Sequence, residues 1–198
     1  MDRARLAAGK KSAARLRATI VFLDESGMLM APLVRRSWSL RGHTPVLHQR
    51  GRSLQKVSAI AAICILPKRD RVALYFRLHA DANVNTERAM EFLEHLQHQL
   101  QTPIVLVWDS FQAHKGELIN QCVLPRSAHL EYLPPYAPEL NPVEYLWAYL
   151  KTNPLANDPA FDLHTLAHRT RRAAHSVQRR PDPLRGFLRH TGLSLRLT

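Results

Sequence analysis

The sequence predicts an α/β domain built on a mixed five-stranded sheet with helices on both faces. Residues 20–23 and 104–108 are continuously apolar, as expected for strands covered on both faces. Residues 57–66 and 72–78 flank a turn at 67–70, which indicates a β-hairpin. Amphipathic helical patterns separate the later strands, which is typical of an α/β fold.

Each element follows from a local pattern. Gly27 permits a turn after the first strand, so we expect residues 28–33 to return as a short extended segment. Asn141 can cap a helix that has Pro142 at its first position. The expected elements are strands at 18–24, 57–66, 72–78, 104–108 and 129–133, and helices at 85–100, at 114–122 and from 142 onward.

The order of these elements predicts the topology. Three strands in an antiparallel meander, followed by two crossover strands, give the spatial order 3-2-1-4-5. The first and fourth strands are then neighbours, which brings Asp24 and Asp109 side by side at one edge of the sheet.

We expect three segments along the chain. Residues 1–17 carry six Lys or Arg residues and form a basic N-terminal arm. Residues 18–155 form the α/β domain. Residues 156–198 form a basic, arginine-rich helical tail that Pro181 and Pro183 split into two helices.

Charge points to a polyanionic partner. The formal net charge is +12 and the pI is about 10.5, which favours nucleic acid over the alternative of a basic surface that only aids solubility. The longest apolar run, at 57–66, is too short to cross a bilayer, and no secretory signal follows Met1. We therefore expect a cytoplasmic, nucleoid-associated protein. The two cysteines match no zinc-site spacing.

Three carboxylates are the candidate site. Glu144 follows Asp109 with 34 residues between them and stands at the third position of the helix capped by Asn141. Together with Asp24 they would offer oxygen ligands to two Mg²⁺ ions, which can activate a water or 3′-hydroxyl for attack on a phosphodiester. The alternatives are that each acid only caps a turn or helix, and that Glu25 or Glu139 takes part instead.

Three blocks carry a family resemblance. The segment Leu133-Pro-Pro-Tyr-Ala-Pro-Glu-Leu-Asn-Pro-Val-Glu-Tyr-Leu-Trp-Ala-Tyr-Leu-Lys151 resembles the catalytic glutamate block of DDE superfamily transposases, in their mariner-like bacterial insertion-sequence branch. Phe22-Leu-Asp-Glu-Ser26, with Arg36-x-Trp38-x-x-Arg41-Gly42-x-x-Pro45 after it, resembles the first-aspartate region. Trp108-Asp109-Ser110-x-x-x-His114-Lys115 resembles the second.

The resemblance implies a ribonuclease H-like fold, two Mg²⁺ or Mn²⁺ ions, and DNA strand cleavage and transfer at transposon ends. It makes Asp24, Asp109 and Glu144 the catalytic and metal-binding triad, and gives His114 either a supporting catalytic role or a capping and packing role. Double-stranded DNA is the expected partner. The side chains expected to contact it are Arg35, Arg36, Trp38, Arg41, Lys115 and Lys151.

Two departures leave alternatives open. Ser110 stands where the family usually has Asn, and only about 17 residues precede the first strand, too few for a helix-turn-helix module. We therefore expect a catalytic domain that acts as a homodimer on DNA, with a helix-turn-helix subunit encoded separately. The alternatives are a truncated, non-catalytic remnant that binds DNA or a partner subunit, and another nuclease of the same fold.

Overall fold

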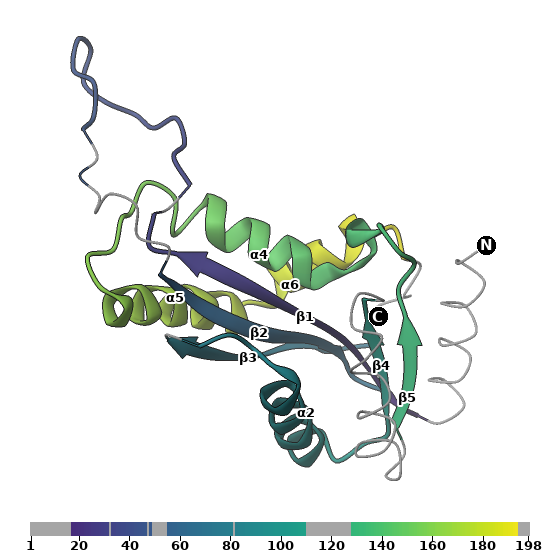
Figure 1. The fold of residues 1–198 in the computed structure, drawn as a ribbon. Helices are drawn as coiled ribbons and strands as arrows, with labels where there is room; N and C mark the ends of the chain where they lie inside the picture. Colours follow the sequence, from purple (N-terminus) through teal and green to yellow (C-terminus); the bar gives the residue numbers. More distant parts are fainter. Residues whose placement is uncertain are drawn as a thin grey trace.

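The fold is described by a computed structural model, which places residues 17–31, 33–46, 48, 55–80, 82–109 and 128–193. Its centre is a five-stranded sheet in the order β3-β2-β1-β4-β5, as predicted (Figure 1). Strands β1, β2 and β3 are antiparallel, whereas β4 and β5 run parallel to β1. The strands are β1 Thr19–Leu29, β2 Lys56–Ile65, β3 Val72–Ala80, β4 Ile104–Trp108 and β5 Ala128–Tyr132.

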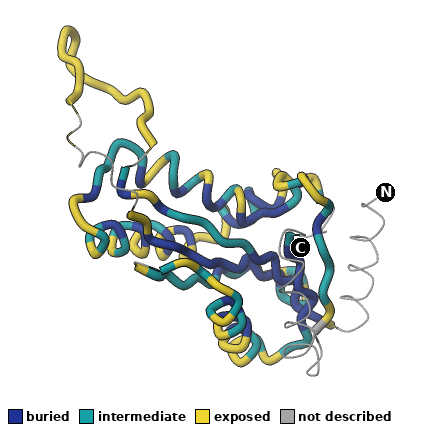
Figure 2. The backbone as a smooth tube through the Cα atoms, in the orientation of Figure 1, coloured by how far each residue is buried: buried dark blue, intermediate teal, exposed yellow. Residues whose placement is uncertain are grey.

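Helices cover both faces of the sheet. On one face, α2 (Thr86–Leu100) packs against the odd-numbered side chains of β1, such as Val21 and Leu23. On the other face, α4 (Pro142–Thr152), α5 (Leu163–Gln178) and α6 (Pro181–His190) cover even-numbered side chains such as Phe22. Strand β2, between β3 and β1, is buried along nearly its whole length, which explains why its sequence is apolar apart from Lys56 and Ser58 (Figure 2).

The first strand is longer than expected, and the turn predicted at Gly27 is wrong. Gly27 pairs with Ser58 and Met28 with Val57, so β1 runs on to Leu29. The strand continues because β2 offers hydrogen-bond partners along its full length, and Met28 is buried. A missing side chain at Gly27 permits a turn but does not impose one.

The remaining elements agree closely with the sequence. Asn85 and Asn141 cap α2 and α4, and the basic tail contains the two expected helices, α5 and α6. These tail helices share a core with the sheet through Leu166, Val177 and Leu188. The division at residue 155 stays a prediction, and the helix expected at 114–122 lies outside the described residues.

A long segment after β1 projects from the domain. Residues 33–46 are exposed throughout and extend away from the sheet (Figures 1 and 2). Asn157 holds the base of this segment, since its side chain accepts from the Arg35 backbone N–H at 2.8 Å and donates to the Arg35 carbonyl at 2.9 Å. None of the helices in the described part of the chain combines the length and apolar character that a membrane span requires.

Candidate active site

Asp24 lies on β1 and Asp109 directly follows the neighbouring parallel strand β4, and both line the same cavity. The ladder between β1 and β4 ends with Phe22 opposite Val107, and each aspartate comes two residues later. Side chains alternate along a strand, and both Phe22 and Val107 face the helices α4 to α6. Asp24 is not at the end of its strand, but it lies two residues beyond the last pair with β4.

Asn141 places the third carboxylate. Its side-chain oxygen accepts from the Val143 N–H at 3.1 Å and so caps α4, while its Nδ2 donates to the Leu23 carbonyl at 3.1 Å. Asn141 is buried, with 2% of its surface exposed. One side chain therefore starts the helix and ties it to the residue before Asp24, which brings Glu144, in the first turn, next to that strand.

Two further polar contacts join α4 to β1. The indole Nε1 of Trp147 donates to Asp24 Oδ2 at 2.8 Å, and Lys151 Nζ donates to Ser26 Oγ at 2.8 Å. Trp147 and Lys151 lie one and two turns beyond Glu144. The helix is therefore fixed along the strand at three successive points.

The three carboxylates line one cavity of about 310 Å³. Its other wall is the proline-rich loop after β5, from Leu133 to Pro138. Tyr136 in this loop has a positive φ of 57° and an entirely exposed side chain. The loop thus holds an aromatic ring at the mouth of the acidic cavity, in a backbone conformation that few non-glycine residues adopt.

The electrostatics of the cavity favour a bound cation. Burial, followed by the charge of Glu144 and then that of Asp109, raises the pKa of Asp24 to about 8. The Trp147 hydrogen bond opposes this rise. Loss of hydration also raises the pKa of Glu144, with a further contribution from Asp109, although Lys151 acts in the opposite direction. All three carboxylates therefore interact, and positive charge in the cavity would relieve their repulsion.

The donor set suits a hard divalent cation, because carboxylate oxygens are the ligands that Mg²⁺ and Mn²⁺ prefer. Among the described residues, no three His, Cys, Asp or Glu side chains converge closely enough to form a ready coordination group. The carboxylates share a cavity without forming a coordination shell. The assignment of Asp24, Asp109 and Glu144 as metal ligands stays a prediction.

The two rival carboxylates lie elsewhere. Glu25 follows Asp24 on β1 and belongs to the opposite face of the sheet, as strand alternation requires. Glu139 lies in a short 3-10 helix, η3 (Pro138–Leu140), and is not among the residues lining the cavity. Neither is positioned to replace a member of the trio.

The residues predicted to contact DNA are dispersed. Arg36, Trp38 and Arg41 lie on the projecting segment, and the Trp38 side chain is 99% exposed. Arg35 reaches back to the body of the domain, where its Nη1 donates to the Thr152 carbonyl at 3.3 Å. Lys151 donates to Ser26, two residues beyond Asp24 on β1. His114 and Lys115 lie outside the described residues.

Sequence reasoning missed two roles. Val143, Leu146, Trp147 and Leu150 follow helical apolar spacing, which predicts only a core-facing Trp147, yet its indole N–H bonds the candidate catalytic aspartate. The signal was present, because a buried tryptophan needs an acceptor for that N–H. The second bond of Asn141, to the Leu23 carbonyl, joins positions 118 residues apart and has no local signature.

Comparison with solved structures identifies the fold. This chain is similar to the Mos1 mariner paired-end complex with Mn (15% identity, TM-score 0.53, covering 98% of this chain and 64% of that one). It is also similar to the paired-end complex with Mg (16%, 0.55, 96% and 62%) and to the catalytic domain of Mos1 mariner transposase (15%, 0.52, 96% and 89%). These matches confirm the ribonuclease H-like fold expected from the resemblance.

The chain spans less than two thirds of the Mos1 chains in the paired-end complexes. No curated protein sequence matches it. Residues 19–167, which include all three carboxylates, match the sequence profile described as DDE superfamily endonuclease. The chain therefore belongs to the DDE superfamily of endonucleases.

Proposed function

We propose that this chain is the catalytic domain of a DNA transposase, which cleaves strands at transposon ends and transfers them to target DNA. The observation that carries this proposal is the common cavity of Asp24, Asp109 and Glu144, three acids from distant parts of a chain in the DDE family. Solved relatives of the same fold are described as paired-end complexes with Mn or Mg.

The cavity residues would hold divalent cations. We infer two ions, held by Asp24, Asp109 and Glu144. When bound, the metal supplies Lewis-acid activation of the attacking oxygen and stabilises the leaving oxygen. In cleavage, the water oxygen bonds to phosphorus and the bond to the 3′ oxygen breaks, leaving a 3′-hydroxyl and a 5′-phosphate. In transfer, the oxygen of that 3′-hydroxyl loses its proton and bonds to a target phosphorus. The bond from this phosphorus to the target's own 3′ oxygen breaks, and that oxygen leaves as a 3′-hydroxyl.

The remaining residues position these groups. Trp147 holds one oxygen of Asp24 through its indole N–H, and Asn141 holds Glu144 against β1. The exposed ring of Tyr136 stands at the cavity mouth, where a nucleotide would enter. His114 would support the phosphate or metal, and Arg36, Trp38, Arg41 and Lys115 would hold DNA.

The wider assembly is also part of the proposal. We infer double-stranded DNA as substrate and a homodimer on that DNA, with a helix-turn-helix subunit supplying recognition of the ends. A cytoplasmic location at the nucleoid follows from such a substrate. The positive charge of the chain supports binding to phosphates, and this binding should weaken steeply as salt rises.

Nicking of supercoiled plasmid by the purified chain with Mn²⁺ tests the proposal. We expect nicking by the wild type and a loss of about a thousandfold or more in Asp109→Asn, since an amide cannot replace a carboxylate ligand. Asp162→Asn is the matched control, because Asp162 caps α5 away from the cavity and asparagine also caps helices. Equal nicking by Asp109→Asn would refute the site.

Calorimetry separates an active domain from a remnant. The wild type should bind Mn²⁺ and Asp109→Asn should lose this binding. A wild-type chain that neither binds Mn²⁺ nor nicks DNA would be a non-catalytic remnant, and the proposal would fail.

A further inference from the structure

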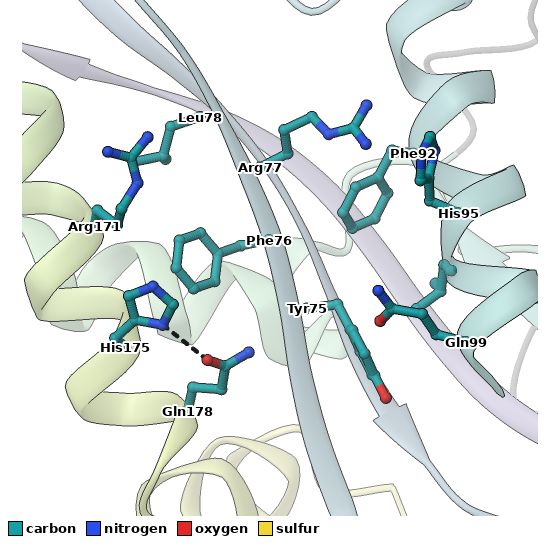
Figure 3. A pocket seen from close by; sticks show the side chains of 11 residues that line it. Tyr75, Phe76, Arg77, Leu78, Phe92, His95, Gln99, Arg171, His175 and Gln178 are labelled. Atoms are coloured by element: carbon teal, nitrogen blue, oxygen red, sulfur yellow. Dashed lines mark hydrogen bonds between the residues drawn. The ribbon is translucent and has the colours of Figure 1, made fainter.

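A groove runs along the open edge of the sheet, away from the carboxylates. Strand β3 is last in the sheet order, with β2 as its neighbour in the described sheet. Two cavities, of about 410 and 530 Å³, lie along this edge, and both are lined by Tyr75 and Gln178 (Figure 3). They share no lining residue with the acidic cavity.

The groove has the form of a slot for an additional strand. Tyr75 faces the α2 side of the sheet and Phe76 the α5 side, yet both line the same cavity. Its walls come from His95 and Gln99 on α2 and from Arg171 on α5, with β3 between them (Figure 3). The two helices therefore flank the strand edge from opposite faces.

The backbone of β3 supplies the floor of the slot. Gln178 Nε2 donates to the Leu74 carbonyl at 2.7 Å, so this carbonyl points outward, away from β2. In an antiparallel strand, residues two apart point their N–H and C=O groups to the same side. The backbone groups of Phe76 and Leu78 therefore also point outward, as a pairing strand requires.

The positive charge of the residues that line the slot favours an acidic partner. Four arginines line the two cavities, against one carboxylate residue, Asp70. Arg77 contacts Glu91 at 3.4 Å, but the Glu91 side chain is 61% exposed, so solvent screens this pair and an incoming carboxylate can compete for Arg77. The arginines are Arg71, Arg77, Arg171 and Arg185.

A peptide fits this edge better than a nucleic acid. Outward carbonyl groups need N–H donors, which a peptide backbone offers at every second residue. A phosphodiester backbone has no such donor, and its oxygens would meet these carbonyls unfavourably. The partly buried rings of Tyr75 and Phe76 line the cavity and also offer apolar contact to alternate side chains of a strand.

We propose that the β3 edge is a docking site for an extended, acidic segment of a partner protein, which adds to the sheet as a further strand. The main-chain bonds come from the outward groups of Phe76 and Leu78, and specificity for acidic side chains comes from Arg77 and Arg171. This site is separate from the proposed catalytic cavity, so Asp109→Asn should dock such a segment as well as the wild type does.

Fluorescence anisotropy with a labelled peptide that repeats Val-Glu-Glu-Val tests the site, because this repeat places glutamates on both faces of an added strand, toward Arg77 and toward Arg171. The peptide has about ten residues, the length of a long strand. We expect Arg171→Glu to weaken its binding by about tenfold or more. Arg172→Glu is the matched control, since Arg172 is the exposed neighbour on α5 and lines neither cavity, and should change binding by less than about twofold. Arg77→Gln serves as a second variant if Arg171→Glu unfolds.

Two further measurements distinguish strand addition from attraction by charge. Bound peptide should slow hydrogen exchange at the Phe76 and Leu78 amides, and the same peptide with N-methylated backbone should lose this effect and bind weakly. Equal binding by the N-methylated peptide, or equal weakening by Arg171→Glu and Arg172→Glu, would overturn the proposal. Displacement of the peptide by single-stranded DNA without any protection of these amides would assign the groove to nucleic acid instead.

Discussion

Helices α4 and α2 lie on opposite faces of the sheet and both start at an asparagine cap, yet they attach in different ways. Helix α2 packs through apolar side chains such as Leu93 and Leu96, and its contact from Glu91 to Arg77 is long and exposed. Helix α4 adds hydrogen bonds to β1 from Asn141, Trp147 and Lys151.

This difference indicates that α2 mainly stabilises the sheet, whereas α4 also positions a catalytic candidate. Apolar burial stabilises a helix without fixing its direction, whereas hydrogen bonds are directional. The helix that carries Glu144 is thus held in register with the strand that carries Asp24. The asymmetry between these helices can be tested by matched substitutions on the two faces.

The largest expected effect is on stability at the crowded carboxylates. The pKa of Asp24 rises from 3.8 to about 8 on folding, so between these values the folded state binds the additional proton and stability falls as pH rises. Without divalent metal, Asp24→Asn should be more stable than wild type at pH 8, by on the order of a few kcal/mol, and nearly equal at pH 4.

Urea unfolding at the two pH values, with and without Mg²⁺, checks this result. Glu94→Gln, on the exposed side of α2, is the control and should leave the pH dependence unchanged. Added Mg²⁺ should narrow the gap between wild type and Asp24→Asn. An Asp24→Asn variant as unstable as wild type at pH 8 would show that Asp24 is not destabilised by its surroundings.

The two asparagine caps give the next effect. Asn141→Ala removes a cap and a buried bond to the Leu23 carbonyl, and should cost about 2–3 kcal/mol in the free energy of unfolding. Asn85→Ala removes only an exposed cap on α2 and should cost about 1 kcal/mol. Chemical denaturation measures both, and equal losses would mean that the Leu23 bond adds nothing.

The smallest expected effect concerns the hydrogen bond from the Trp147 indole to Asp24. Trp147→Phe keeps an aromatic ring but loses the N–H donor, so it should cost about 1 kcal/mol of stability and weaken Mn²⁺ binding about tenfold. Trp38→Phe, at a 99% exposed position, should change neither quantity. Calorimetric titration measures the affinity for Mn²⁺. An unchanged affinity in Trp147→Phe would show that Trp147 contributes only packing.

Much of the fold could be predicted because its signals are local. Continuous apolar runs gave β2 and β4 to within a residue, and the Asn-Pro pair gave the start of α4. The prediction failed where neighbours overrode local preference, as at Gly27, which pairs with Ser58 inside a long strand. The candidate triad could be identified from spacing and resemblance, but its surroundings could not.

The sequence by itself determined where the five strands lie along the chain and their order in the sheet, because buried strands have a recognisable pattern of apolar residues. Only the tertiary structure decided which polar atoms form hydrogen bonds between distant parts of the chain. The bond from Trp147 to Asp24 joins residues 123 apart, and the slot beside β3 exists because α2 and α5 flank the same open edge. Such contacts depend on where distant backbones lie in space, and no local pattern encodes that position.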